Sequence, residues 1–395
     1  MAHITEVRID GLLGRSEPVH IRFDRGVNIF FGENGSGKTT LLKILDAALS
    51  RDGEAMHRLP VERAEVSIYT ITEAKIIKHV WERKEPRRST AVERHLALLK
   101  RETIETFDGG YRLVETIGPD LEWKLTPAAK ESSSRARRWE HTFLQTTRLY
   151  FGDVRLGRPG ERRPHLPEHE LDQAFGESVN RAWLQFYSQT LNAVRNIQES
   201  GLRTVLRQVL SPEGDRPLED SADAGAVYLR VAKFLTRQPD SEKIALGSPA
   251  SFKRRYEQDH NLRRIVDNLD NVERQIEGAM IPVDSFLSTI TALFSRGKSL
   301  SLSSNELQVL LADGQNLPIS SLSSGEKHLI KILLSCMTAG PNSVLIDEPE
   351  LSMHIDWQRV FVKTMLSLNP KSQLILASHS PEIMAEIDDN CIVRL

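Results

Sequence analysis

"GVNIFFGENGSGKTTLLKILDAALS", residues 26–50, is the stretch that decides the fold. Residues 26–31 form an apolar run that is typical of a strand buried on both faces of a sheet. Residues 41–50 carry leucines at helical spacing, which predicts an amphipathic helix. Between them, GENGSGKT (32–39) matches the pattern G-x-x-x-x-G-K-[ST] in full. A strand, a glycine-rich turn and a helix in this order predict an α/β sheet with an anion-binding loop.

Phosphate chemistry accounts for the residue types of this loop. Glycines permit backbone turns that aim successive N–H groups inward, and the following helix adds its positive N-terminal end. Lys38 supplies a mobile positive charge for β- and γ-phosphates, and Thr39 supplies a hydroxyl for Mg²⁺. A chance glycine-rich turn is the structural alternative, which the flanking strand and helix disfavour. The predicted nucleotide-binding residues are Gly32, Asn34, Gly35, Ser36, Gly37, Lys38, Thr39 and Thr40.

A second apolar run, SVLIDEPE (343–350), ends in acidic residues. Asp347 and Glu348 are expected at the carboxyl end of a buried strand, where open α/β sheets bind ligands. We expect Asp347 to hold Mg²⁺ and Glu348 to polarise the attacking water as a catalytic residue. Adjacent carboxylates repel each other unless a cation offsets their charge. A solvated strand end is the structural alternative.

A third apolar run, LILAS (374–378), is followed by His379. A lone histidine is usually a satisfied structural residue, but this one follows a strand that is predicted to end at the phosphate edge of the sheet. We therefore expect His379 to contact the γ-phosphate or the attacking water. Together with Lys38 and Glu348, it completes the predicted catalytic set.

A serine–glycine turn, SSLSSGEK (320–327), precedes another amphipathic helix. Ser323 and Glu326 have the spacing of a capping box, which is the structural interpretation of the turn. A helix N-terminus can also receive an anion, which is the functional interpretation. Both can hold together, because the capped helix is the one that presents the turn.

The rest of the chain alternates between strand-like and helical regions. Residues 60–130 contain strand-like segments separated by turn residues, which predict an antiparallel β lobe. Residues 168–280 show helical spacing, and their second heptad run is too short for a long coiled-coil arm, so we expect a short helical hairpin. Strand signals then return, so the two ends of the chain are expected to build one parallel sheet. The expected domains are residues 1–165 with the β lobe, a helical insertion of residues 166–281, and residues 282–395.

Composition excludes several classes of protein. A net charge of −2 is not that of a polycation built to coat nucleic acid. Two cysteines, Cys336 and Cys391, disfavour a disulfide framework and favour a cytoplasmic location. No apolar run approaches the roughly 20 residues that span a bilayer, so no membrane is expected as a partner. Residues 132–165 hold eight arginines against three acidic residues, a net charge of +5, and are either a solvated loop or a nucleic-acid or partner contact.

Four motifs together carry a family resemblance: GENGSGKT, LSSGE (322–326), LIDEPELSMH (345–354) and ASHS (377–380). Their order is typical of ABC-type ATPases. The chain resembles the SMC-like branch, which includes overcoming-lysogenization-defect (OLD) nucleases, and most closely the stand-alone ATPase subunits of phage-defence systems such as PARIS or Septu. The resemblance implies an α/β P-loop NTPase fold of ABC type with a mixed sheet, an antiparallel β lobe and a helical insertion. The cofactors that it implies are ATP and Mg²⁺.

The same resemblance implies roles for particular residues. In such ATPases the signature turn, here Ser323, Ser324, Gly325 and Glu326, acts in trans on the γ-phosphate bound to a second subunit. Ser324 stands where the usual pattern has glycine. His354 stands where transporters carry an aspartate, which favours the SMC-like branch. Gln145 is the candidate for the glutamine that reaches the metal.

These expectations combine into a function. We expect a Mg²⁺-dependent ATPase that forms dimers or higher oligomers through shared ATP sites. The short stretch after His379 leaves no room for the C-terminal nuclease domain of OLD proteins, so we expect a separate effector nuclease, in a two-component antiviral defence system. The alternative is an SMC-like DNA-binding repair or recombination ATPase, with residues 132–165 as its nucleic-acid contact. His354 and the helical insertion disfavour a transporter motor.

Overall fold

The computed structural model describes residues 2–70, 75–83, 112–115, 140–145, 167–210, 228–229, 248–294, 297–303 and 305–395. Apart from residues 140–145, the basic segment 132–165 lies outside the described residues. The chain divides into two compact units: unit 1 is Met1–Ala182 with Phe286–Leu395, and unit 2 is Trp183–Ser285.

The central element of unit 1 is a five-stranded sheet in which every described pairing is parallel. Its strands come from both ends of the chain and from one internal segment. Their order is β13 (Ile392–Arg394), β3 (Val27–Phe31), β12 (Gln373–Ser378), β11 (Ser343–Asp347) and β7 (Thr142–Gln145). Every residue of β11 and β12 is buried, as the continuous apolar runs predict.

A second sheet is entirely antiparallel. Its order is β2 (Val19–Arg22), β1 (Ala2–Asp10), β4 (Arg63–Thr70), β5 (Lys75–Glu82) and β6 (Arg112–Glu115). A small third sheet contains β10 (Asn316–Pro318), β9 (Glu306–Leu311) and β8 (Lys298–Ser303). Parallel and antiparallel pairings therefore occupy separate sheets, and the N-terminal strands join the antiparallel one.

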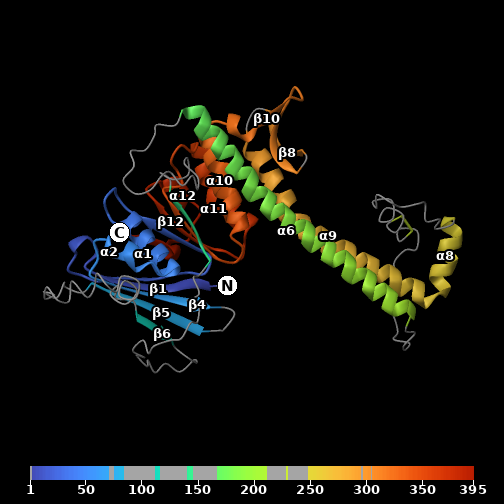
Figure 1. The fold of residues 1–395 in the computed structure, drawn as a ribbon, viewed down its shortest axis with the longest axis horizontal. Coiled ribbons are helices and arrows are strands. Elements are labelled where there is room, and N and C mark those ends of the chain that lie inside the picture. Colours follow the sequence, from blue (N-terminus) through green and yellow to red (C-terminus); the bar gives the residue numbers. More distant parts are fainter. Residues whose placement is uncertain are drawn as a thin grey trace, which may run out of the picture. The chain divides into compact units, whose positions relative to one another are not determined.

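Helix α1 (Lys38–Ser50) lies between the parallel and antiparallel sheets (Figure 1). Its core cluster includes Ile4 and Val66 from the antiparallel sheet and Leu345 and Ile375 from the parallel one. The sequence predicted one apolar side for this helix, but it is buried on several sides because a sheet covers each of two faces. Short helix α2 (Gly53–His57) follows α1 in the chain. The 3-10 turn η1 (Leu12–Gly14) packs beside the N-terminus of α1.

One buried glutamine joins the two large sheets. The Gln373 side-chain oxygen accepts from the backbone N–H of Ile4 and from the Ser343 hydroxyl, each at 2.9 Å. Its amide nitrogen donates to the backbone oxygens of Ile4 at 2.7 Å and Asp24 at 2.8 Å. Three of these contacts are buried, where the groups would otherwise be left without water, so this residue fixes β1 against β12.

The remaining helices of unit 1 include α10 (Ser324–Thr338), α11 (Ile355–Leu368) and α12 (Pro381–Met384), with 3-10 turns η2 (Ile319–Ser321) and η3 (Asp389–Cys391) (Figure 1). Cys336 is fully buried in α10, and burial raises the pKa of its thiol to about 12. This thiol is therefore a packing group of the core.

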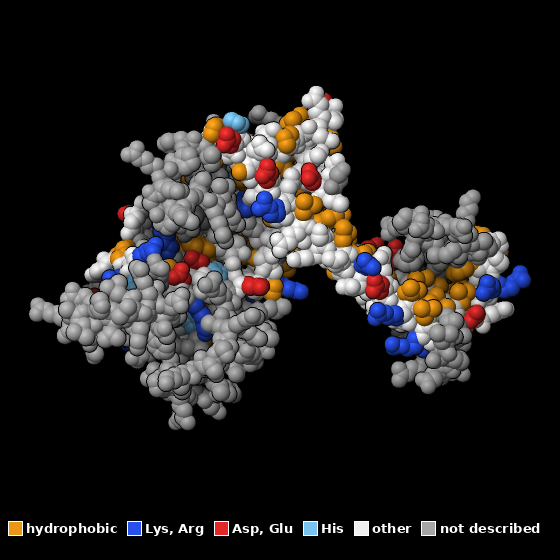
Figure 2. All heavy atoms as spheres, viewed as in Figure 1, with side chains coloured by type: hydrophobic (Ala, Val, Ile, Leu, Met, Phe, Trp, Pro, Cys, Tyr) orange, Lys and Arg blue, Asp and Glu red, His pale blue; other side chains and the backbone are white. Residues whose placement is uncertain are grey.

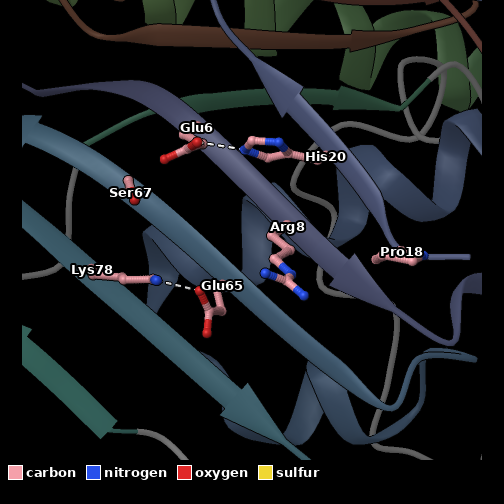
Figure 3. Close-up of a pocket in the computed structure, with 7 residues that line it drawn as sticks. All are labelled: Glu6, Arg8, Pro18, His20, Glu65, Ser67 and Lys78. Atoms are coloured by element: carbon pink, nitrogen blue, oxygen red, sulfur yellow. Dashed lines mark hydrogen bonds and ion pairs between the residues drawn. The ribbon is translucent and has the colours of Figure 1, made fainter.

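The outer face of the antiparallel sheet carries a hollow of about 410 Å³. Its lining residues are Glu6, Arg8, Pro18, His20, Glu65, Ser67 and Lys78. Figure 3 shows Glu6 directed at His20 and Lys78 directed at Glu65. Lys78 balances the charge of Glu65 on a face that period-2 alternation leaves to solvent. No residue of the phosphate loop lines this hollow.

Unit 2 is helical and contains most of α6 (Glu168–Leu210) and α9 (His260–Leu293), with α8 (Pro249–Gln258). The expected short hairpin is wrong in length: α6 has 43 residues and α9 has 34. The heptad run covers only part of α9, which continues through Val283 into Phe286 and Ile290, both fully buried in unit 1. Unit 2 begins later than residue 166 because the first turns of α6 belong to unit 1, where Asp172 pairs with Lys327 at 2.6 Å.

Among the described residues of unit 2, two contacts join its helices. A Cβ placed on Gly201 of α6 would lie 2.3 Å from Cγ2 of Val272 in α9, so the absence of a side chain lets the two helices approach closely. Phe252 and Tyr256 of α8 pack with Val266 of α9. Several large apolar side chains of this unit remain exposed, and Figure 2 shows hydrophobic side chains beside lysines and arginines around α8.

By length and composition alone, the segment Leu262–Leu293 of α9 meets the requirement for a membrane-spanning helix, with 17% of its most apolar window buried. The sequence expectation rested on uninterrupted apolar runs, whereas this window tolerates the charged residues Glu277 and Asp284. A single helix of this kind is weak evidence for a membrane segment.

Candidate nucleotide-binding site

The parallel sheet brings the predicted motifs to one edge. Its register pairs Ser378 with Phe31, Ala377 with Asp347, and Asp347 with Gln145. Because carboxyl ends of parallel strands share an edge, the phosphate loop, His379, the two acids and the end of β7 follow one another in strand order. The side chain of Gln145 lies outside the described atoms, so only its backbone position beside Asp347 is known.

The phosphate loop ends in an uncapped helix. Gly35 has φ of 87° and Gly37 has φ of 102°, in the left-handed region that favours glycine. Gly37 is the N-cap residue of α1 and supplies no side-chain hydrogen bond, and no acidic residue occupies the first turn. The N–H groups at this helix end are thus left for an anion. Asn34 is exposed, and Ser36 and Thr40 are partly buried in the same turn.

Lys38 is buried and folds back over its own loop. Its Nζ donates to the backbone oxygens of Gly32 at 2.7 Å and Glu33 at 2.9 Å. Sequence reasoning missed Arg15, whose guanidinium donates to the backbone oxygen of Ser36 at 3.2 Å. Arg15 is distant from the motif in sequence and carries no recognisable signal, so only the folded chain reveals the second cation at this loop.

Asp347 joins the loop to the strand edge. Its Oδ1 accepts from the Thr39 hydroxyl at 2.9 Å, and its side chain is largely buried. Burial raises the pKa of Asp347, the Thr39 hydrogen bond opposes this, and the charge of neighbouring Glu348 adds to the rise. A hydroxyl and a carboxylate oxygen in contact are ligands that Mg²⁺ prefers, and a cation would remove the electrostatic cost of the paired acids. These residues therefore fit Mg²⁺.

Glu348 has an unusual backbone conformation. Its φ is 50°, in the left-handed region that costs free energy for a residue with a side chain. Its N–H donates to the backbone oxygen of Ala377 at 2.8 Å, which continues the β11–β12 ladder by one residue. The strand pairing thus holds the strained residue in place at the edge of the sheet.

His379 is held by an acid that sequence reasoning missed. Its Nδ1 lies 3.0 Å from Oε1 of Glu350, while the imidazole remains 46% exposed. The same Oε1 accepts from the His379 N–H at 2.7 Å and from the Ser378 hydroxyl at 2.8 Å. Glu350 follows Glu348 by two residues in DEPE, and this third acid in the motif was the available signal.

The signature turn satisfies its own helix. Ser323 caps α10, with its N–H and hydroxyl donating to Glu326 Oε2 at 2.9 and 2.8 Å, and its oxygen accepting from the Glu326 N–H at 3.4 Å. Among the residues that the structure describes, no hydrogen bond joins this turn to the phosphate loop. Ser323 and Ser324 are exposed. A Cβ on Gly325 would lie 2.5 Å from the backbone oxygen of Ser352, so a side chain cannot fit there.

Lys298 of β8 is a further residue that sequence reasoning missed. Its Nζ lies 2.9 Å from Oε1 of Glu326. Burial acts to raise the pKa of Glu326, but the hydrogen bonds from Lys298 and Ser323 outweigh it and hold the pKa below its ordinary value. Glu326, the last residue of the signature turn, is therefore an ionised carboxylate whose charge is balanced by Lys298. His354 follows Ser352 by two residues and caps α11, because its Nδ1 accepts from the Asp356 N–H at 3.4 Å.

Parts of this chain are similar to known proteins. A family profile described as "AAA domain, putative AbiEii toxin, Type IV TA system" matches residues 181–385, and one described as "AAA domain" matches residues 6–142. A Vibrio cholerae serotype O1 biovar El Tor protein named "Retron Vc95 probable ATPase" is 31% identical in a 91-residue alignment that covers 20% of this chain and only 18% of that protein's length.

Two solved structures are also similar. The Smc head domain of Pyrococcus furiosus with an extended coiled coil, bound to the C-terminal domain of ScpA, is 16% identical with a TM-score of 0.40, over 100% of this chain and 93% of that chain. The SMC head domain from Thermotoga maritima is 12% identical with a TM-score of 0.40, over 97% and 91% of the two chains.

The α/β expectation is confirmed: a parallel sheet that carries the phosphate loop, a separate antiparallel sheet and an interrupting helical unit make up the described chain, and both matching family profiles are described as AAA domains. The first family profile covers more than half of the chain, and its matched residues include the signature turn, Asp347 and Glu348 at the end of β11, and His379. This chain therefore belongs to the family described as "AAA domain, putative AbiEii toxin, Type IV TA system".

Proposed function

We propose that this chain is a Mg²⁺-dependent ATPase whose complete catalytic site forms between two copies of the chain. The observation that carries the proposal is a contrast between two turns. The phosphate loop opens onto a helix end without a cap, whereas the exposed signature turn has no described hydrogen bond to that loop. A site that needs both turns is therefore completed by a second copy, in a dimer or a higher oligomer.

Binding uses groups that already converge. Backbone N–H groups of residues 32–40 would donate hydrogen bonds to the ATP phosphates. Lys38 would give up its hydrogen bonds to the loop carbonyl oxygens and donate to β- and γ-phosphate oxygens instead. Thr39 and Asp347 would hold Mg²⁺, with Gln145 as a further contact. The bound ion would neutralise charge on the phosphates.

Hydrolysis would use the two residues at the strand tips. Glu348 accepts a proton from water, whose oxygen bonds to the γ-phosphorus while the bond to the β-phosphate oxygen breaks. His379 contacts the γ-phosphate. Ser323, Ser324, Gly325 and Glu326 of the second copy approach the same phosphate from the other side, so nucleotide state and assembly are linked.

A mixing experiment tests the shared site. Ser323→Arg puts a bulky cation where a small hydroxyl should meet the partner's phosphate, and Lys38→Ala removes a subunit's own phosphate lysine. Each variant alone should be inactive as a homo-oligomer. Mixed in equal amounts, half of the dimers pair one intact loop with one intact signature, so activity should return to about a quarter of wild type.

Two controls make the result decisive. Ser367→Arg introduces the same cation at an exposed position of α11 and should retain activity. Subunit exchange is measured independently, by co-purification of differently tagged copies. If the exchanged mixture is as inactive as its two components, the signature turn does not serve a partner's nucleotide.

For the cellular role, we propose a cytoplasmic ATPase that senses a trigger and controls a separate effector nuclease in a two-component antiviral system. The family description and the retron-named relative support this proposal.

Exposed leucines in unit 2 offer an apolar contact for the effector, and Leu202 and Leu206 lie one helical turn apart on α6. Leu202→Glu with Leu206→Glu should abolish binding of the proposed effector nuclease and spare ATP binding. Retained nuclease binding would refute this contact.

An SMC-like DNA-binding role is the second candidate. Lys253, Arg254 and Arg255 are consecutive exposed cations on α8, which favours a contact with phosphates of DNA. This role predicts DNA binding that weakens steeply with salt, needs no effector protein, and is lost when the three cations are replaced by alanine. Electrophoretic mobility assays at several salt concentrations distinguish the two roles.

A further inference from the structure

Glu350 is placed to control His379 from the same loop that carries Asp347 and Glu348. Its side chain is only 5% exposed, and one carboxylate oxygen receives three contacts from two consecutive residues. The Ser378 hydroxyl accepts from the Ser380 N–H at 3.0 Å, so its own proton is directed at Glu350. All the described donors to this carboxylate therefore belong to the turn that bears His379.

The other carboxylate oxygen of Glu350 lowers the stability of the fold. Oε2 is buried, and no partner for it occurs among the described residues. Burying a carboxylate with one unsatisfied oxygen costs free energy that an apolar side chain would avoid. Nearby His328 does not offset the charge with a cation, because burial lowers its pKa while the Pro349 carbonyl and the charge of Glu350 only partly oppose this. Because this buried carboxylate lowers stability, it points to a role for Glu350 beyond packing.

We propose that Glu350 is a positioning residue that holds His379 with a proton on Nδ1 and presents Nε2 to the reacting phosphate or water. Nδ1 lies 3.0 Å from a carboxylate oxygen, which can only accept, so this ion-pair distance favours a proton on Nδ1. This leaves Nε2 on the exposed side of the ring, and the His379 N–H held by the same oxygen fixes the backbone. The inference rests on the proposed catalytic contact of His379, but the state of the ring can be measured without turnover.

The first test is a double-mutant cycle with Glu350→Gln, His379→Ala and the combined variant. Glutamine keeps the volume and an acceptor oxygen but loses the charge, so kcat should fall by roughly 10–100-fold, as for other partners that orient a reacting group. ATP binding should stay unchanged. In the His379→Ala background, Glu350→Gln should cost nothing more, because its effect passes through the ring.

Glu382→Gln is the matched control, since it removes a partly exposed carboxylate of α12 that pairs with Arg359. It should leave turnover unchanged. If Glu350→Gln hydrolyses ATP at the wild-type rate, or slows the His379→Ala variant by the same factor as wild type, Glu350 does not act through His379.

The second test does not use Glu350→Gln, so it holds even if that variant misfolds. Histidine-¹⁵N nuclear magnetic resonance reports which ring nitrogen carries a proton, with the His379 signal assigned by its loss in His379→Ala. A protonated Nδ1 supports the proposal, and an unprotonated Nδ1 overturns it. An inactive wild-type protein with a protonated Nδ1 would refute the proposed ATPase function but not the contact.

Discussion

The N-termini of α1 and α10 follow similar turns of glycine and serine but satisfy their backbone groups in opposite ways. α1 begins after Gly37, which offers no side-chain cap and precedes a first turn without acids. α10 begins after Ser323, whose hydroxyl caps the helix, and Glu326 completes a capping box. The first helix leaves its N–H groups for a ligand, and the second satisfies its own.

This difference separates two events. ATP can enter the phosphate loop without breaking a cap, whereas a phosphate that reaches Ser323 must compete with Glu326 for the serine proton. A serine cap contributes about 0.5–2 kcal/mol, which is small enough for a charged phosphate to displace. Lys298 would meanwhile keep the displaced carboxylate neutralised. Nucleotide binding and recognition by a second copy are therefore distinct steps of the proposed mechanism.

The largest expected effect tests whether the chemistry belongs to the strand edge rather than to either helix end. Glu348→Gln should slow hydrolysis by roughly 10²–10⁴-fold, because the water loses its general base. ATP affinity should be retained, since both helix ends are intact. Phosphate release and binding of a fluorescent ATP analogue measure the two effects. Turnover at the wild-type rate would remove Glu348 from the mechanism, and exposed Glu386→Gln serves as control.

The next effect isolates the open helix end. Lys38→Ala should weaken ATP binding roughly 10–100-fold, because a hydrogen bond to a charged group contributes about 1.5–3 kcal/mol. Ser323→Ala should leave ATP binding by an isolated subunit unchanged. Equilibrium titration with the fluorescent analogue checks both, with exposed Lys371→Ala as control. Equal loss of ATP affinity in both variants would mean that the two helix ends do not differ in their role in nucleotide binding.

A smaller effect concerns stability at the closed helix end. Ser323→Ala should lower the free energy of unfolding by about 1 kcal/mol, because α10 loses its cap. Urea denaturation with and without ATP measures this change, and Ser367→Ala, on the exposed face of α11, is the control. An unchanged free energy of unfolding would mean that the capping box does not stabilise α10.

The smallest effect is a pH dependence. The pKa of Glu326 is lower in the folded chain than its ordinary value of 4.5. Its stabilisation is therefore fully present above pH 4.5 and is lost as pH falls through the folded pKa. The stability difference between wild type and Glu326→Gln should shrink on acidification, as followed by urea denaturation at several pH values. A constant difference would contradict the ionised Lys298–Glu326 pair.

Local sequence patterns predicted the elements on which the site is built. The glycines of the phosphate loop, the buried strand before Asp347 and the cap at Ser323 each lie within a few residues, so turn chemistry and hydrophobic periodicity suffice to identify them. The same patterns misjudged α9, because its heptad run continues into a segment whose apolar residues pack in unit 1.

Tertiary structure decided which distant groups meet. Lys298 and Glu326 are on different elements, Arg15 reaches the phosphate loop from another turn, and Gln373 joins strands from opposite ends of the chain. Such contacts depend on how sheets stack and how strands align, and no short-range preference encodes them. The sequence by itself determined a phosphate loop, its acids and a capped signature helix. Only the fold determined that Glu350 holds His379, because that contact requires β11 and β12 to be neighbours in register.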